Sequence, residues 1–80
     1  MNYFVYILKS TFKNWYYIGF TSNLEKRLLQ HNFGSVKSTK FYKPLSLVFA
    51  QIVKNTHDAR DLEKFLKVRF NKEALLQLIL

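Results

Sequence analysis

Two short segments near the start of the chain constrain the fold most. Residues 3–9 and 15–20 are both dense in aromatic and β-branched side chains, and residues 10–14 between them are mostly polar. Such side chains favour extended backbone, and two runs of this kind joined by a short polar loop predict an antiparallel hairpin. Neither run alternates strictly between apolar and polar residues. We therefore expect both faces of the hairpin to be at least partly covered by other elements.

The segment after the hairpin predicts a helix. Ser22 and Glu25 have the spacing of a capping box, in which each side chain satisfies a free amide of the first turn. The helix is expected to run to about Asn32, with Gly34 as its stop. A basic loop rich in Ser, Thr and Lys follows, over residues 35–43.

The second half of the chain predicts one more strand and two more helices. Residues 45–53 read as the strand, Asn55 and Thr56 as the cap of a helix over about 58–70, and residues 72–80 as a short last helix. The expected apolar stripe of the longer helix comprises Ala59, Leu62, Phe65 and Leu66. The order β-β-α-β-α-α predicts an α+β fold, a small three-stranded antiparallel sheet flanked by helices.

Length and composition limit the kind of protein this can be. Eighty residues suffice for one domain, expected over 1–80, and an aromatic content of 18% can build a core in so small a chain. The absence of cysteine excludes disulfides and Cys-based zinc sites. The sequence shows no signal peptide and no apolar run of the roughly 18 residues that a membrane span needs. These features are compatible with a cytoplasmic protein.

The net charge of +8 is large for this chain, and the pI is near 9.9. A positive field of this size attracts polyanions, of which nucleic acid is the expected one. The alternative is a basic composition without a specific partner. Lysines are spread along the chain rather than gathered in one stripe, which suits contact with phosphates better than contact with a membrane.

Two tripeptides and three later residues carry a resemblance to a known family. The tripeptides are Phe4-Val5-Tyr6 and Tyr17-Ile18-Gly19, each within one of the two aromatic runs. Arg27 and His31 follow on one face of the first helix, and Glu63 lies at the edge of the apolar stripe of the second. Together they resemble the signature of the GIY-YIG nuclease superfamily, from Tyr3 to about Lys67, and the chain looks most similar to its small standalone bacterial members. The first tripeptide lacks the usual glycine.

The resemblance implies a metal-dependent endonuclease and a role for each of these residues. Glu63 would bind Mg²⁺ or Mn²⁺, and Arg27 would hold the scissile phosphate. Tyr6 would lie near the attacking water as a general base or an orienting group, Tyr17 would hydrogen-bond phosphate or water, and His31 would donate to phosphate or relay a proton to Tyr6. An ordinary tyrosine has a pKa of about 10, so a base at this position needs a nearby cation.

Each of these residues also has an ordinary structural interpretation. Glu63 has the i,i+4 spacing for an ion pair with Lys67, and Arg27 could be a surface residue of a basic helix. Tyrosines in strands are usually core residues, and a lone histidine on a helix is more often structural than catalytic. Asn71 is the one candidate for a late asparagine that supports the site in the superfamily.

The expected partner is DNA. The proposed phosphate contacts are Lys26, Lys37, Lys40 and Lys43. No helix-turn-helix or zinc finger is recognisable, so cleavage should have low sequence specificity, since phosphate contacts position a protein but do not specify a sequence. A role in DNA repair or processing is the functional hypothesis. Two alternatives stay open, a nucleic-acid-binding module with little hydrolysis and a basic structural protein that binds partners through an exposed apolar tail, residues 75–80. The oligomeric state stays open as well.

Overall fold

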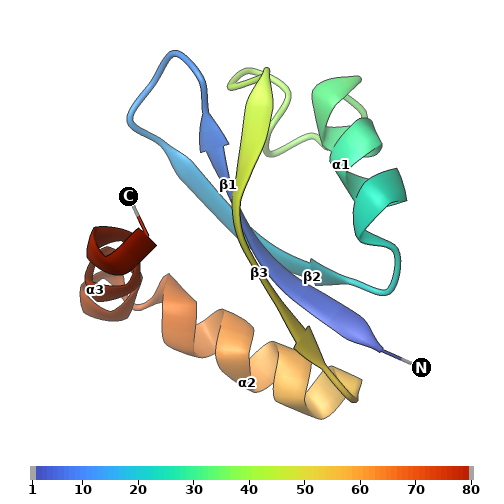
Figure 1. The fold of residues 1–80 in the computed structure, drawn as a ribbon. Helices are drawn as coiled ribbons and strands as arrows, with labels where there is room; N and C mark the ends of the chain where they lie inside the picture. The colour runs from blue at the N-terminus through green and yellow to red at the C-terminus, as the bar shows by residue number, and fades with distance from the viewer. Residues whose placement is uncertain (1, 80) are drawn as a thin grey trace.

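The computed structural model describes residues 2–79, apart from the side chain of Phe70, and its elements follow the predicted order (Figure 1). They are β1 (Tyr3–Ser10), β2 (Tyr16–Thr21), α1 (Leu24–Asn32), β3 (Leu45–Val53), α2 (Thr56–Lys67) and α3 (Arg69–Ile79). The sheet is antiparallel with the strand order β2-β1-β3. The predicted α+β fold is confirmed. Among the described residues, no helix is both long enough and apolar enough to cross a membrane.

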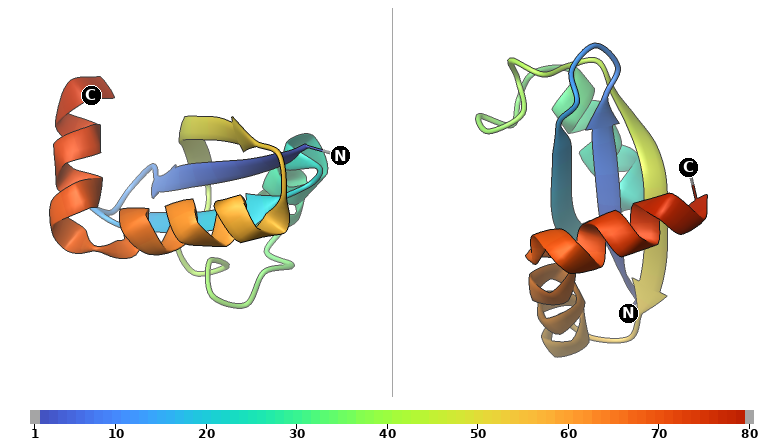
Figure 2. Two further views of the ribbon diagram at one scale, coloured as in Figure 1. Left: turned by 90° about the horizontal axis from the view of Figure 1, so that it is seen from below. Right: turned by 90° about the vertical axis from the view of Figure 1, so that its left-hand side faces the viewer.

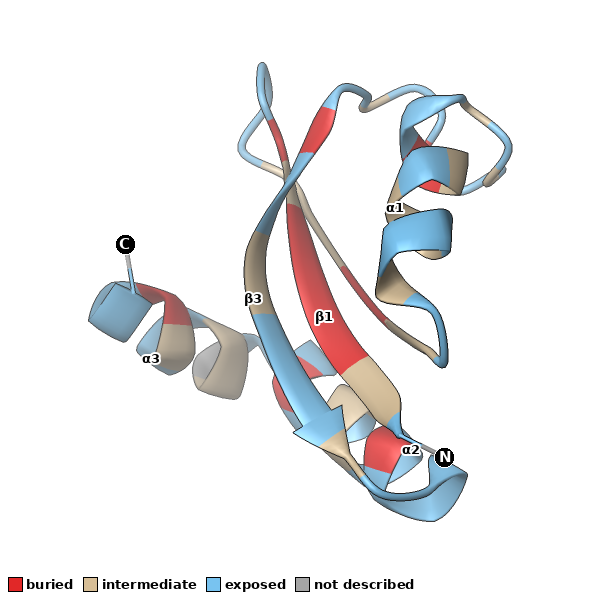
Figure 3. Ribbon diagram, turned by 45° about the vertical axis from the view of Figure 1, so that its right-hand side comes forward, coloured by how far each residue is buried: buried red, intermediate tan, exposed pale blue. Residues whose placement is uncertain are grey.

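The central strand β1 separates two hydrophobic clusters. Successive side chains of a strand point to opposite faces, so Val5 and Ile7 pack toward α2 while Tyr6 and Leu8 pack toward α1. Figure 2 shows the sheet between α1 on one side and α2 with α3 on the other. Figure 3 shows that the middle of β1 is buried, whereas most of the edge strand β3 is exposed. Both faces of the hairpin are covered, as its lack of strict alternation predicted.

The cluster toward α2 holds most of the purely apolar core. Ala59 and Leu66 of α2 are buried against the strands, and Leu62 is partly buried beside them. Phe65 was predicted in the same stripe, but its side chain is 56% exposed. At 100° per residue, Phe65 lies about 100° from Leu66 around the helix, which places it outside the stripe.

The helix ends correct the predicted boundaries by a few residues. The capping box at Ser22 and Glu25 does not form, because Asn23 caps α1 and its side chain accepts from the backbone N–H of Lys26 at 3.1 Å. Gly34, the predicted stop, has a φ of 80°. Asn55 caps the next helix as expected.

The boundary between the last two helices lies earlier than predicted. α2 ends at Lys67 rather than continuing to 70, because Val68 is extended, and α3 begins at Arg69 rather than at 72. In α3, Leu76 is buried while Leu78 and Ile79 are exposed, so only part of the predicted exposed tail is exposed. Leu80 lies outside the described residues.

Long-range contacts fix the path of the segment between α1 and β3, which we call the 33–44 loop. The side chain of Asn32 pairs with the backbone of Leu45, accepting from its N–H at 2.7 Å and donating to its carbonyl at 3.1 Å. The N–H of Thr11 in the β1–β2 turn donates to the carbonyl of Pro44 at 3.0 Å. The β1–β2 turn and the 33–44 loop therefore lie at the same end of the molecule (Figures 1 and 2).

Candidate active site

The strand register brings the two signature tyrosines together on the α1 face of the sheet. Tyr6 pairs with Gly19 and Leu8 pairs with Tyr17, so the two tyrosines are diagonal neighbours with ring centroids 6.2 Å apart. Diagonal pairs across two strands are within reach of aromatic side chains. The sequence left this register open.

Gly19 makes room for both rings. A Cβ atom at this position would lie 2.9 Å from the Tyr6 hydroxyl oxygen and 2.9 Å from Cε2 of Tyr17. Both distances are shorter than a carbon tolerates, so any side chain here must displace the tyrosines. The glycine of the second tripeptide is thus required by the close approach of two side chains rather than by an unusual backbone angle.

His31 connects Tyr6 to the 33–44 loop. The imidazole is completely buried, with Nε2 2.9 Å from the Tyr6 hydroxyl oxygen and Nδ1 2.8 Å from the hydroxyl oxygen of Thr39. The hydroxyl of Thr39 also donates to the carbonyl of Val36 at 3.3 Å. Because a hydroxyl has one proton, Thr39 accepts from Nδ1–H. We therefore assign the tautomer in which Nε2 carries no proton and accepts from the hydroxyl of Tyr6.

Burial keeps this chain of hydrogen bonds neutral. Burial and the nearby Arg27 guanidinium lower the pKa of His31 to about 4. Burial raises the pKa of Tyr6 above its ordinary value, and Arg27 offsets this only in part. Burial lowers the pKa of Arg27 itself, but the contacts with Tyr6 and Tyr17 outweigh that effect and raise it, so the guanidinium stays charged.

Arg27 belongs to α1, and its side chain lies beside the two signature tyrosines of the sheet. Its Nη1 donates to the side-chain oxygen of Gln30 at 3.1 Å, which holds the guanidinium in place. Lys26, Arg27 and Gln30 line an open pocket of about 510 Å³ together with the end of β2. This pocket offers two positive charges to an anion.

Glu63 comes from α2, the helix on the other face of the sheet. Its carboxylate lies 3.5 Å from Nζ of Lys67, so the ion pair expected from their spacing is present. Its side chain is 21% exposed, and its negative charge is among the effects that raise the pKa of Tyr6. Among residues 2–79, no group of three or more His, Cys, Asp or Glu residues could hold a metal ion. A single carboxylate still fits Mg²⁺, which commonly takes one or two protein carboxylates and keeps several waters.

Comparison with known proteins decides the family. Residues 2–76 match the model of the GIY-YIG catalytic domain. The chain belongs to the GIY-YIG family. It is 40% identical to UPF0213 protein CPE1444 of Clostridium perfringens over 80 residues, which cover 99% of this chain and 83% of that protein. It is 42% identical over 72 residues to UvrABC system protein C of Mycoplasmopsis agalactiae, covering 86% of this chain but 13% of that protein.

A solved structure agrees with the fold. The solution NMR structure of UPF0213 protein BH0048 from Bacillus halodurans matches with a TM-score of 0.61 and 31% identity, covering 98% of this chain and 85% of that one. The GIY-YIG resemblance and the predicted sheet flanked by helices are therefore both confirmed.

The other residues predicted for the GIY-YIG site are three lysines of the 33–44 loop and Asn71. Lys37, Lys40 and Lys43 are exposed in the 33–44 loop, and their predicted phosphate contacts stay predictions. Asn71 has a structural contact, since its side-chain amide donates to the carbonyl of Phe65 at 2.8 Å near the end of α2. The interpretation of Asn71 as part of the site gains no support from this position.

Two residues that contact the candidate GIY-YIG site were missed by sequence analysis. Gln30 could have been found, because it lies three residues after Arg27 and so shares a helix face with it. Thr39 could not, because it lies in an irregular loop without a periodic pattern. Its proximity to His31 depends on how the loop folds back.

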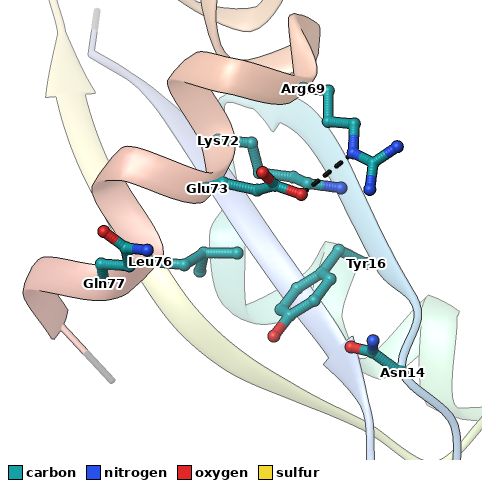
Figure 4. A pocket seen from close by; sticks show the side chains of 7 residues that line it. All are labelled: Asn14, Tyr16, Arg69, Lys72, Glu73, Leu76 and Gln77. Carbon is teal, nitrogen blue, oxygen red and sulfur yellow. Dashed lines mark hydrogen bonds and ion pairs between the residues drawn. The ribbon is translucent and has the colours of Figure 1, made fainter.

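A second pocket, of about 700 Å³, lies away from the GIY-YIG residues (Figure 4). It is formed by α3 and the start of β2, with Tyr16 on one side and Arg69 paired to Glu73 at 3.0 Å on the other. Tyr16 packs with the cluster toward α2, on the face of the sheet opposite Tyr6 and Tyr17. Although this pocket is the larger of the two, it lies away from both signature tyrosines, and we do not take it as the candidate active site.

Proposed function

We propose that this chain is a divalent-metal-dependent nuclease that hydrolyses DNA phosphodiester bonds with low sequence specificity, in DNA repair or processing. The observation that carries the proposal is the buried chain of hydrogen bonds from Tyr6 through His31 to Thr39, next to the charged Arg27. The Arg27 guanidinium beside both tyrosines can bind a phosphate, and the family match supports a nuclease.

The pKa values favour Tyr6 as an orienting group over Tyr6 as a general base. Burial raises the pKa of Tyr6 and lowers the pKa of His31 to about 4, so transfer of the proton from Tyr6 to His31 is strongly unfavourable. Because Tyr6 donates its proton to His31, its oxygen can accept from the Arg27 guanidinium and from one water. We propose that Tyr6 aims the attacking water in this way.

Arg27 would bind the scissile phosphate. A guanidinium can donate two parallel hydrogen bonds to phosphate oxygens, and the pocket that it lines contains Lys26 as a second positive charge. The contact with Gln30 orients Arg27 before substrate binds. Tyr17 would donate to the same phosphate or to the water.

Glu63 would hold Mg²⁺ or Mn²⁺. When bound, such an ion supplies a positive centre that polarises the phosphate and stabilises the leaving oxygen. Nζ of Lys67 lies 3.5 Å from a carboxylate oxygen of Glu63. This ammonium would have to move aside, or bind a phosphate oxygen, when Glu63 binds an ion.

The test compares Glu63→Gln with Tyr6→Phe in single-turnover cleavage of nicked, branched and linear DNA, beside a calorimetric titration with Mn²⁺. We expect Glu63→Gln to lose metal binding and cleavage while DNA binding persists. Tyr6→Phe should bind metal normally and cleave about 10²-fold more slowly or worse. Glu73→Gln is the matched control, since Glu73 also forms an i,i+4 ion pair but lies in the other pocket. Normal cleavage by Tyr6→Phe would refute its role.

A second candidate function is a nucleic-acid-binding module without hydrolysis. The ion pair between Glu63 and Lys67 favours this second function, because a carboxylate that is already paired with an ammonium binds a metal cation more weakly. This alternative predicts salt-dependent DNA binding but no cleavage with Mg²⁺ or Mn²⁺, and no effect of EDTA on binding. Metal-dependent cleavage that Glu63→Gln abolishes would exclude it.

A further inference from the structure

We propose that three exposed phenylalanine rings beside the candidate site bind the unpaired bases of single-stranded DNA, which would make strands with unpaired segments the preferred substrate. The rings belong to Phe12, Phe33 and Phe41, and with Lys13, Lys40 and Lys43 they form what we call the aromatic–lysine surface. This proposal rests on the proposed function and adds the substrate class to it.

The rings are unusually accessible. The exposed fractions are 58% for Phe12, 77% for Phe33 and 75% for Phe41. Phenylalanine is normally among the most buried residues, so three exposed rings from two neighbouring loops indicate a ligand-binding surface.

Lysines lie between the rings and connect them. Nζ of Lys13 is 5.7 Å from the ring centroid of Phe12 and 5.6 Å from that of Tyr42, so one ammonium joins the β1–β2 turn to the 33–44 loop. Nζ of Lys40 is 5.0 Å from the ring centroid of Phe41.

The backbone next to Phe33 lies close to two further lysines. Gly34, which follows Phe33, lies against Lys40 and Lys43: a Cβ built on Gly34 would be 3.8 Å from Cβ of Lys40 and 3.1 Å from Nζ of Lys43. Phe33 is thus followed directly by a backbone position that lies against two of the lysines.

The base of the surface is well anchored. The rings of Trp15 and Tyr42 are stacked with centroids 3.8 Å apart and planes within 5° of parallel, and the N–H of Thr11 binds the carbonyl of Pro44. The stack ties the β1–β2 turn to the 33–44 loop, so the two loops present their exposed rings together. A surface held in place before binding loses less entropy when a ligand arrives.

The charge distribution identifies the partner. Residues 26–57 contain no Asp or Glu, and four of the five acidic residues of the chain follow them. The aromatic–lysine surface therefore offers phosphate-binding ammonium groups and flat rings together. A single strand presents phosphates and accessible base faces, whereas a duplex hides its base faces in the stack. An anionic membrane offers the phosphates without the bases.

The surface adjoins the candidate active site. Lys40 directly follows Thr39, whose hydroxyl accepts from the imidazole of His31. A strand bound on the surface would therefore pass close to Tyr6 and Arg27.

The test is DNA binding by the full chain in EDTA, which prevents cleavage. The probes are a fluorescein-labelled single strand, a duplex of the same length, and an abasic strand with the same number of phosphates but no bases. Wild type should bind the single strand more tightly than the abasic strand, by roughly tenfold or more for each stacked base. The triple variant Phe12→Leu, Phe33→Leu and Phe41→Leu should lose this preference and bind both strands alike.

The matched control is Phe65→Leu, because Phe65 has a comparably exposed ring on α2, the helix that packs on the other face of the sheet. It should bind as wild type does. If the triple variant keeps the preference for bases, the stacking proposal is wrong while DNA binding still supports the proposed function. If wild type binds none of the three probes, both proposals fail.

Two other partners of the surface, a membrane and a second copy of the chain, would give different results. Binding to phosphatidylglycerol vesicles that is tighter than binding to the single strand and is lost in the triple variant would identify a membrane partner and overturn the proposal. A wild-type dimer in sedimentation that the triple variant dissociates would identify a subunit interface and overturn it equally.

Discussion

Acidification should destabilise this protein through His31. The imidazole is completely buried, and its pKa is about 4 in the folded chain against 6.5 in the unfolded one. The unfolded state therefore binds the proton more tightly, and stability falls as pH falls. The contribution of His31 is fully present above pH 6.5 and is lost progressively as pH falls toward 4. The difference between the two pKa values corresponds to about 3 kcal/mol, a large share of the stability of a small domain.

The structural reason lies in the partners of the imidazole. A second proton would go to Nε2, which faces the hydroxyl of Tyr6, so that hydroxyl would lose its acceptor. The ring of Tyr17 lies 4.9 Å from the imidazole, and the positive charge of Arg27 is near. Burial and repulsion from Arg27 both oppose a second positive charge here.

The assay is urea unfolding followed by the fluorescence of Trp15, at several pH values between about 7 and 4, for wild type and two variants. His31→Gln should be less stable at neutral pH, because it disturbs a buried hydrogen-bonded site, but its stability should fall less with acid, by about 3 kcal/mol. His57→Gln removes an exposed histidine of α2 and is the matched control for the loss of a histidine. Parallel curves for wild type and His31→Gln would refute the reasoning.

Three further predictions concern the same region. Gly19→Ala should destabilise the fold by about 1–3 kcal/mol and weaken the Tyr6–His31 hydrogen bond, because its Cβ would lie 2.9 Å from the Tyr6 oxygen; an unchanged melting temperature would contradict this. Thr39→Val should lower the free energy of unfolding by about 1–3 kcal/mol, because Nδ1–H of His31 is left unpaired, whereas Thr39→Ser should keep both stability and cleavage rate. Equal melting temperatures for the two variants would contradict the assigned tautomer. DNA affinity should fall steeply with salt, with a slope of roughly 0.9 per phosphate neutralised, so a flat response would exclude nucleic acid as partner.

The sequence predicted the elements well where the signal is local. The hairpin and the third strand follow from dense aromatic and β-branched runs, and Asn55 is a cap in both prediction and structure. The cap of α1 was misplaced by one residue because Ser22 and Asn23 are both good caps, and the choice depends on the backbone after β2. The break at Val68 has no local signal, since neither glycine nor proline lies near it.

The candidate site was predictable only as far as the family resemblance reaches. It led to Tyr6, Tyr17 and His31, whose rings contact one another on the α1 face. It did not give the strand register that makes the tyrosines diagonal neighbours, nor the hydroxyl of Thr39. Both depend on pairings between segments far apart in the chain, which periodicity within one segment does not contain.

The pairing of Asn32 with Leu45 has a consequence for how such proteins diversify. One side chain clamps the backbone where the 33–44 loop returns, so the ends of the loop are held without help from its middle. Closing a longer loop costs little, about 0.6 kcal/mol for each doubling of its length. Loops of other lengths and compositions can therefore be exchanged between Asn32 and Leu45 without shifting β3, provided that a hydroxyl still reaches His31. The same junction is a graft point at which an engineer can replace the loop and leave the rest of the scaffold unchanged.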